Sequence, residues 1–106
     1  MRPRRRSIPR LPAKQEVILE LLIGRREMYG LELVAASRGR LKRGTVYVTL
    51  GRMEEKGYIR SHLEDAPPDA GGLPRRLYEA TPLGRRVLDA WAHVARLLPE
   101  LARARS

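Results

Sequence analysis

The sequence predicts a mainly α-helical fold with a small β-hairpin, and three features of its 106 residues support this prediction. In the first half, apolar residues recur at helical spacing in three short stretches. An alternating segment then leads into a stretch rich in proline, glycine and aspartate, as in a hairpin with a long tip. In the last quarter, apolar residues recur at alternating spacings of four and three, which is typical of a helix that packs against another helix.

The composition favours one small domain with a polyanionic partner. The 22 basic residues outnumber the 12 acidic ones and give a net charge of +10. Lys14, Lys42 and Lys56 are the only lysines, which leaves 19 arginines, and guanidinium groups bind phosphate through paired N–H groups. Without cysteine there is no thiol nucleophile, disulfide or thiolate metal site. Residues 17–23 are too short an apolar stretch to span a membrane, so we expect no membrane partner.

Residues 1–11 are expected to form a flexible basic arm. Five arginines and two prolines fall within the first ten residues, and this composition buries too little surface to offset the entropy of the chain. The first helix is expected over residues 12–23, where apolar residues share one face and Gly24 follows as a stop. The second begins after residues 29–30 and ends near residues 37–39, a length of about two turns.

The third helix, over residues 45–56, is expected to have a core side and a basic side. Val46, Leu50 and Met53 share its apolar face. Thr45 is a candidate N-cap, a role that would occupy its hydroxyl with backbone. A glycine inside a helix costs about 1 kcal/mol relative to alanine, so we expect another backbone to approach closely at Gly51.

A hairpin and a final helix complete the predicted order. Residues 59–64 and 76–80 have strand patterns, and the proline- and glycine-rich segment between them forms the tip. Thr81 is expected to cap the last helix, with Pro82 at its first position. A later proline, Pro99, is expected to kink or break this helix.

The final helix carries an apolar seam that is expected to hold two copies of the chain together. Exposed apolar surface of this kind usually marks an interface, and the domain is too small to cover the seam alone. In the alternative, Trp91 covers the core of its own three helices. The expected interface residues are Val87, Trp91, Val94 and Leu98.

Three helices followed by a hairpin are the element order of a winged helix-turn-helix fold. We expect residues 12–81 to form this DNA-binding domain and residues 82–106 to form a C-terminal dimerisation helix. In such folds the third helix enters the major groove, which is about 12 Å wide, and the hairpin, or wing, contacts the backbone beside it.

Three sequence blocks resemble the PadR family of bacterial transcriptional regulators. They are YGLEL at residues 29–33, GTVYVTLGRMEEKGYI at residues 44–59 and PRRLYEATPLG at residues 74–84. The resemblance covers residues 13–98 and implies a homodimeric repressor in the bacterial cytoplasm, bound to the nucleoid when on DNA. The single helix after the wing looks like the compact branch of the family. Members often carry proline where this chain has Val48.

The candidate DNA-binding residues lie on the third helix, before it and at the base of the wing. Hydroxyl, phenol and guanidinium groups donate hydrogen bonds to phosphates and base edges. Alternatively, Tyr47 packs on Leu50, Arg52 pairs with Glu55, and the flanking cations form a solvated rim. The arginines of the arm would enter a minor groove or add nonspecific attraction. The candidates are Lys42, Arg43, Thr45, Tyr47, Val48, Thr49, Arg52, Arg75 and Arg76.

Catalysis finds little support in the sequence. Neither His62 nor His93 gathers the ligands that zinc requires, and no glycine-rich loop precedes a helix as in phosphate-binding sites, so we expect no enzyme, metal or cofactor. The alternative function is a winged-helix adaptor that binds protein or RNA through its basic surface. A flat aromatic effector is a further candidate, bound against Trp91 between two copies of the last helix.

Overall fold

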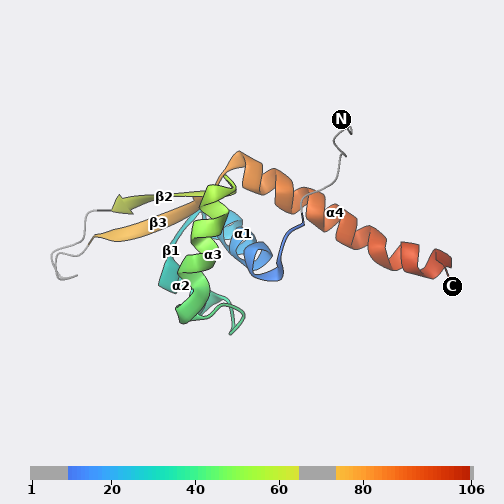
Figure 1. The fold of residues 1–106 in the computed structure, drawn as a ribbon, viewed down its shortest axis with the longest axis horizontal. Helices are drawn as coiled ribbons and strands as arrows, with labels where there is room; N and C mark the ends of the chain where they lie inside the picture. Colours follow the sequence, from blue (N-terminus) through green and yellow to red (C-terminus); the bar gives the residue numbers. More distant parts are fainter. Residues whose placement is uncertain (1–9, 65–73, 106) are drawn as a thin grey trace, which may run out of the picture.

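The computed structural model describes residues 10–64 and 74–105, and it confirms a mainly helical fold with a small antiparallel sheet (Figure 1). The helices are α1 (Ala13–Arg25), α2 (Gly30–Ala36), α3 (Arg43–Glu55) and α4 (Pro82–Arg105). The strands are β1 (Glu27–Tyr29), β2 (Ile59–Glu64) and β3 (Arg75–Ala80). Most of the predicted arm and of the predicted wing tip lies outside the described residues.

The sheet has three strands, whereas the sequence predicted a two-stranded hairpin. The third strand, β1, pairs antiparallel with β3, so the strand order is β1-β3-β2. Its three residues are too few for alternation to distinguish a strand from the start of a helix. Because β1 directly precedes α2, this pairing fastens the helix-turn-helix to the base of the wing.

The core lies where α1, α2 and α3 meet the inner face of the sheet. Val46, Leu50 and Met53 of α3 are fully or almost fully buried there, as their spacing predicted. Leu11 joins the same core with 2% of its surface exposed, although the sequence placed it in the arm. Leu11 therefore belongs to the folded part of the chain.

Two helix boundaries differ from the prediction. The first helix runs through Gly24 and ends at Arg25, and the change of direction falls on Arg26, which has a φ of 75°. The third helix begins at Arg43, so its N-cap is Lys42 and not Thr45. Thr45 has no capping role, because its own backbone N–H donates to the Lys42 carbonyl at 3.2 Å.

The close backbone approach predicted at Gly51 occurs at another glycine. Among the described residues, and apart from its own helix, nothing lies within 4 Å of a Cβ built on Gly51, which faces solvent. At Gly84, in the first turn of α4, a Cβ would overlap the backbone carbonyl of Tyr58. The first turn of α4 therefore packs directly on the chain that leaves α3.

Thr81 caps α4, as the sequence predicted. Its Oγ1 accepts a hydrogen bond from the Gly84 backbone N–H at 3.0 Å and donates to the Gly57 carbonyl at 2.5 Å. α4 then continues to Arg105, so the helix does not break at Pro99, and the kink that the sequence also predicts there stays a prediction. A proline inside a helix costs about 3 kcal/mol, but strong helix formers, chiefly alanine, leucine and arginine, flank this one.

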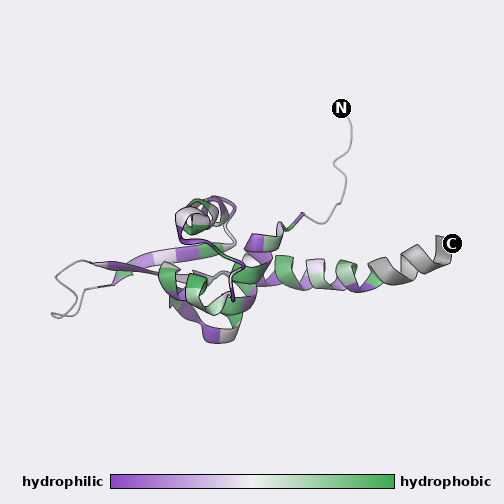
Figure 2. Ribbon diagram, turned by 90° about the horizontal axis from the view of Figure 1, so that it is seen from below, coloured by the Kyte–Doolittle hydropathy of each residue, from purple (hydrophilic) through white to green (hydrophobic). Residues whose placement is uncertain are grey.

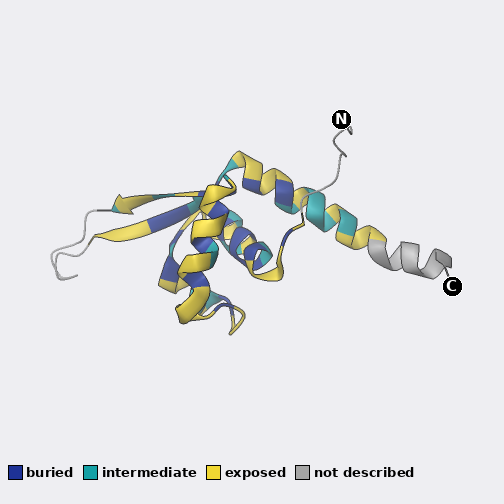
Figure 3. Ribbon diagram, in the orientation of Figure 1, coloured by how far each residue is buried: buried dark blue, intermediate teal, exposed yellow. Residues whose placement is uncertain are grey.

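α4 leaves the rest of the molecule after its first turns. Figure 1 shows it projecting away from the sheet and from α1, and in Figure 3 the buried residues of α4 lie only in its first turns, among exposed ones. Figure 2 shows hydrophobic and hydrophilic residues alternating along it. Among the described residues, no helix is long and apolar enough to cross a membrane.

Candidate nucleic-acid interface

One face of α3 is turned to solvent, although it carries apolar as well as polar groups. Tyr47 is 50% exposed and Val48 58% exposed, and Thr45 and Arg52 are exposed beside them. Thr49 is half-buried, and its hydroxyl donates to the Thr45 carbonyl at 3.3 Å. The predicted recognition residues of this helix therefore share one accessible face.

Two grooves flank this face of α3. The first has a volume of about 470 Å³, and its lining includes Tyr29, Tyr47, Arg75 and Arg76, from β1, α3 and the base of the wing. The second measures about 410 Å³ and separates α3 from the start of α1. Its lining residues are Pro12, Ala13, Lys14, Gln15, Thr45, Val48, Thr49 and Arg52. α3 is thus a ridge with cations in the groove on either side.

Contacts within the sheet orient the two arginines at the base of the wing. The Arg75 guanidinium lies over the Tyr29 ring, 5.1 Å from its centre. The Tyr29 hydroxyl donates to the Glu64 carboxylate, a hydrogen bond that raises the pKa of the phenol. Arg76 donates to the Ser61 hydroxyl at 3.0 Å. Both guanidinium groups remain exposed beside the first groove.

The N-terminus of α3 gathers positive charge. Lys42 is its N-cap, Arg43 is its first residue, and its first turn has no acidic side chain. The N-terminus of a helix already carries a partial positive charge, so two cations there oppose the stability of the helix by about 0.3–1 kcal/mol each. An anion at this end of α3 would reverse that effect.

The alternatives in which Tyr47 packs on Leu50 and Arg52 pairs with Glu55 can be compared with the contacts of both residues. The Tyr47 ring lies against Gly30, where a Cβ would come within 2.7 Å of its hydroxyl oxygen, and half of the residue stays exposed. In the described part of the chain, Arg52 forms no ion pair with Glu55. Lys56 is turned toward α1, where it donates to Gln15 Oε1 at 3.2 Å.

Lys14 is the cation at this surface that sequence reasoning missed. It lies in the first turn of α1 and lines the second groove with Thr45 and Arg52. The helical pattern placed it on a face away from the core, but it could not show that this end of α1 lies beside α3. A tertiary contact between separate helices brings the three residues together.

The predicted dimer seam divides between the core and the surface. Val87 is only 6% exposed and packs within the chain's own core, so it offers little surface to a second copy. Trp91 is half-buried and packs against the same core, and Val94 is half-buried farther along α4. The side chain of Leu98 lies outside the described part of the chain.

The two histidines have different surroundings. His62 on β2 lies beside Glu27 of the unpredicted strand β1 and Glu79 of β3, so it does share a cluster of potential metal ligands. The sequence prediction missed this cluster because it missed β1. His93 is exposed on α4, where its ring nitrogen is 3.4 Å from the Arg96 guanidinium.

Comparison with known proteins relates this geometry to a family. The sequence profile of the transcriptional regulator PadR-like family matches residues 18–90. A comparison with curated protein sequences finds no match.

Solved structures of regulators are similar to the chain in fold. A PadR family transcription regulator from hypervirulent Clostridium difficile is 29% identical over 85% of this chain and 94% of that chain, with a TM-score of 0.70. A PadR family transcriptional regulator from Eggerthella lenta is 27% identical over 86% of this chain and 80% of that chain, with a TM-score of 0.67. Bacillus subtilis PadR in complex with operator DNA is 20% identical over 78% of this chain and 48% of that chain, with a TM-score of 0.67.

The helices, the wing and the similar structures agree on a winged-helix fold. The profile match extends from α1 across α2, α3 and both wing strands into α4, which is more than half of the chain. The chain therefore belongs to the PadR-like family, whose members are transcriptional regulators and not enzymes.

Proposed function

We propose that the chain is a sequence-specific repressor that binds duplex DNA as a homodimer in the bacterial cytoplasm. The observation that carries this proposal is the exposed ridge of α3 between two grooves that hold Lys14, Arg52, Arg75 and Arg76. An α-helix fits the major groove, and the phosphate backbones on either side would then lie over the two grooves. The Bacillus subtilis relative, which shares the fold, was solved with operator DNA.

Three groups on the accessible face of α3 each suit one kind of DNA contact. Val48 presents a branched apolar surface, which favours the methyl group of thymine. Because the Thr49 hydroxyl donates to the Thr45 carbonyl, its lone pairs are left to accept from a base amino group. The exposed Arg52 guanidinium, which has no ion-pair partner among the described residues, can donate two hydrogen bonds to guanine.

The remaining cations suit contacts with phosphate, which carry no sequence information. Lys42 and Arg43 would meet a phosphate at the N-terminus of α3, where the partial charge of the helix adds to their own. Arg75 and Arg76 are held by Tyr29 and Ser61 on the wing side of the ridge. Contacts on both sides of α3 would fix its register in the groove.

Homodimerisation is supported by the projection of α4 away from the rest of the chain (Figure 1). Val94 is half-buried and Leu97 is 41% exposed on this segment, beyond the turn that packs on the core. A two-fold pairing of α4 would cover this apolar surface and set the distance between two copies of α3. An operator with two related half-sites is therefore expected.

Footprinting on the DNA upstream of the chain's own gene tests this function. We expect a protected site that survives competition by unrelated duplex, because specific binding exceeds nonspecific binding by about 10³-fold or more. Transcription from that promoter in vitro should fall as the site fills. Equal competition by unrelated duplex would contradict a repressor, and stronger competition by RNA of the same length would favour the adaptor function.

A further inference from the structure

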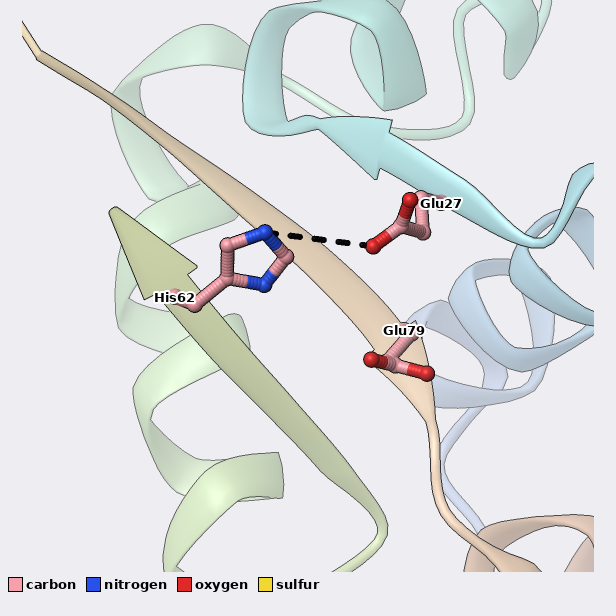
Figure 4. A group of neighbouring side chains, drawn as sticks. All are labelled: Glu27, His62 and Glu79. Atoms are coloured by element: carbon pink, nitrogen blue, oxygen red, sulfur yellow. Dashed lines mark ion pairs between the residues drawn. The ribbon is translucent and has the colours of Figure 1, made fainter. Parts of the chain in front are cut away.

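Three potential metal ligands from three strands meet on one face of the sheet. Glu27 of β1, His62 of β2 and Glu79 of β3 each offer a ligand atom, and these atoms lie within 4.8 Å of one another (Figure 4). His62 Nε2 is 4.0 Å from Glu27 Oε2. Ser61, the neighbour of His62, bonds to Glu54 of α3, and successive strand residues point to opposite faces. The cluster therefore lies on the face away from α3.

The strand register places two like charges opposite each other in this cluster. Glu27 is directly opposite Glu79 in the β1–β3 pair, and like charges at opposed positions destabilise a sheet. Arg60 approaches Glu79 from the other side, with its Nε 3.3 Å from Oε2, and so offsets one of the two carboxylates. Among the described residues, the ion-pair partner of Glu27 is His62, which is charged only when protonated.

The ligand set suits a divalent transition-metal ion. One imidazole nitrogen and two carboxylate oxygens are common ligands of Zn²⁺, and water would complete a tetrahedron. Bonds of about 2.0–2.1 Å place neighbouring ligand atoms of a tetrahedron about 3.4 Å apart. The separation of 4.0 Å between His62 and Glu27 is close to this distance. Side-chain rotation can shorten this separation to that of two bound ligands, because the Glu27 and His62 side chains are 45% and 52% exposed.

Nearby arginines compete with an ion for the two carboxylates. Arg60 Nη2 donates to Glu79 Oε1 at 3.4 Å, in addition to the ion pair through its Nε. Arg26 and Arg85 line the same groove as Glu27 and Glu79. A bound ion would share Glu79 with Arg60, so removal of the Arg60 charge should tighten metal binding.

We propose that Glu27, His62 and Glu79 form a surface site for a divalent transition-metal ion. The ion joins β1 to β2 across β3, so occupancy links the strand that leads into α2 with a strand of the wing. Binding therefore stabilises the sheet and holds the wing against the helix-turn-helix. The proposal does not depend on the proposed DNA-binding function, because its test uses the protein without DNA.

The chain contains two histidines, which makes the test internally controlled. Zn²⁺ is titrated into the untagged full chain while the ring signals of His62 and His93 are followed by NMR. We expect the His62 signals to shift to a saturating end point with one equivalent bound, while the His93 signals stay in place. A rise in the thermal unfolding midpoint should accompany saturation.

Variants distinguish a specific metal site from general attraction of the ion to surface carboxylates. Glu27→Gln removes a ligand and also the like-charge repulsion, so it should fold at least as stably as the wild type and lose the His62 response. Arg60→Gln should lower the Zn²⁺ dissociation constant severalfold, and His93→Gln should leave it unchanged. Equal responses of both histidines, no response of His62, or full binding by the Glu27→Gln variant would each overturn the proposal.

Discussion

Glycines that look alike in the sequence have opposite surroundings in the fold. Gly51 and Gly84 both lie inside helices, where glycine normally costs stability. Open space surrounds Gly51, whereas the backbone carbonyl of Tyr58 occupies the space that a Cβ at Gly84 would need. A backbone cannot yield as a flexible side chain can, so of these two positions only residue 84 strictly requires glycine.

Alanine at these two positions should change stability in opposite directions. Gly51→Ala should stabilise the chain by about 1 kcal/mol, because it removes only the flexibility of glycine in a helix. Gly84→Ala should destabilise it by about 1–3 kcal/mol or more, because α4 must shift away from Tyr58. Urea unfolding of both variants measures the two changes, and a shift of the same sign in both would contradict this packing.

Arginines on α3 and at the base of the wing should have different effects on DNA binding. Arg76→Gln should weaken binding to operator and unrelated duplex alike and lower the slope of log affinity against log salt by about one, as expected for loss of one phosphate contact. Arg52→Gln should mainly reduce the preference for operator, and Thr49→Val should do the same. Arg75→Gln should behave like Arg76→Gln. Unchanged affinity in all four variants would place the DNA-binding site elsewhere.

At the scale of elements, α4 has two roles along its length. Its first turns pack on the core through Val87, and Thr81 fixes its start by bonding to both Gly57 and Gly84. Beyond Trp91 the helix leaves the domain, and its apolar residues have less of the chain's own surface to cover them. A substitution on the projecting segment can therefore test dimerisation with little effect on the fold.

Val94→Glu should convert the proposed dimer to a monomer, because a paired α4 would bury an uncompensated charge at this position. His93→Glu, on the exposed neighbouring position, is the matched control and should remain dimeric. Trp91→Glu should lower both dimerisation and stability, since this ring also packs on the chain's own core. Sedimentation velocity measures the mass of each variant. A dimer that is unaffected by Val94→Glu would remove α4 from the interface.

Elements with strong local signals were predictable, whereas contacts between distant segments were not. The cap of α4 could be predicted because Thr81 and Pro82 act within one turn. The wing strands could be predicted from their alternating apolar and polar residues. β1 was not predicted, because three residues are too few to show the alternation of a strand. Without β1, the sequence could not place Glu27 beside His62. The apolar faces located the core, but not the close approach of α4 to Tyr58.

The candidate DNA-binding site likewise has a part that the sequence predicted and a part that it could not predict. The exposed face of α3 followed from its apolar face, because the other residues of the helix must point outward. The groove that joins Lys14 to Arg52 depends on how α1 crosses α3, which no local pattern encodes. The seam on α4 was assigned to an interface as a whole, although Val87 lies in the core of the single chain.

At the scale of the whole molecule, the proposed dimer offers a place where a ligand could control DNA binding. Trp91 is half-buried on α4 beside small residues, and a flat aromatic molecule stacked on it between two copies would change the distance between the two α3 helices. Such a ligand acts only through the difference in its affinity for the two spacings. We expect planar cationic dyes to quench Trp91 fluorescence and to weaken operator binding in parallel. No quenching by a broad panel, with the dimer intact, would leave Trp91 as interface core.

Selection of duplexes from a random pool, at physiological salt, tests most directly whether α3 reads sequence as part of a dimer. The wild type should enrich a palindrome whose half-sites are about one helical turn apart, the spacing expected for two recognition helices on one face of DNA. Val48→Ala should enrich the same palindrome with a relaxed preference at one thymine in each half-site. A pool that stays random, or a motif without two-fold symmetry, would contradict sequence-specific recognition by a dimer.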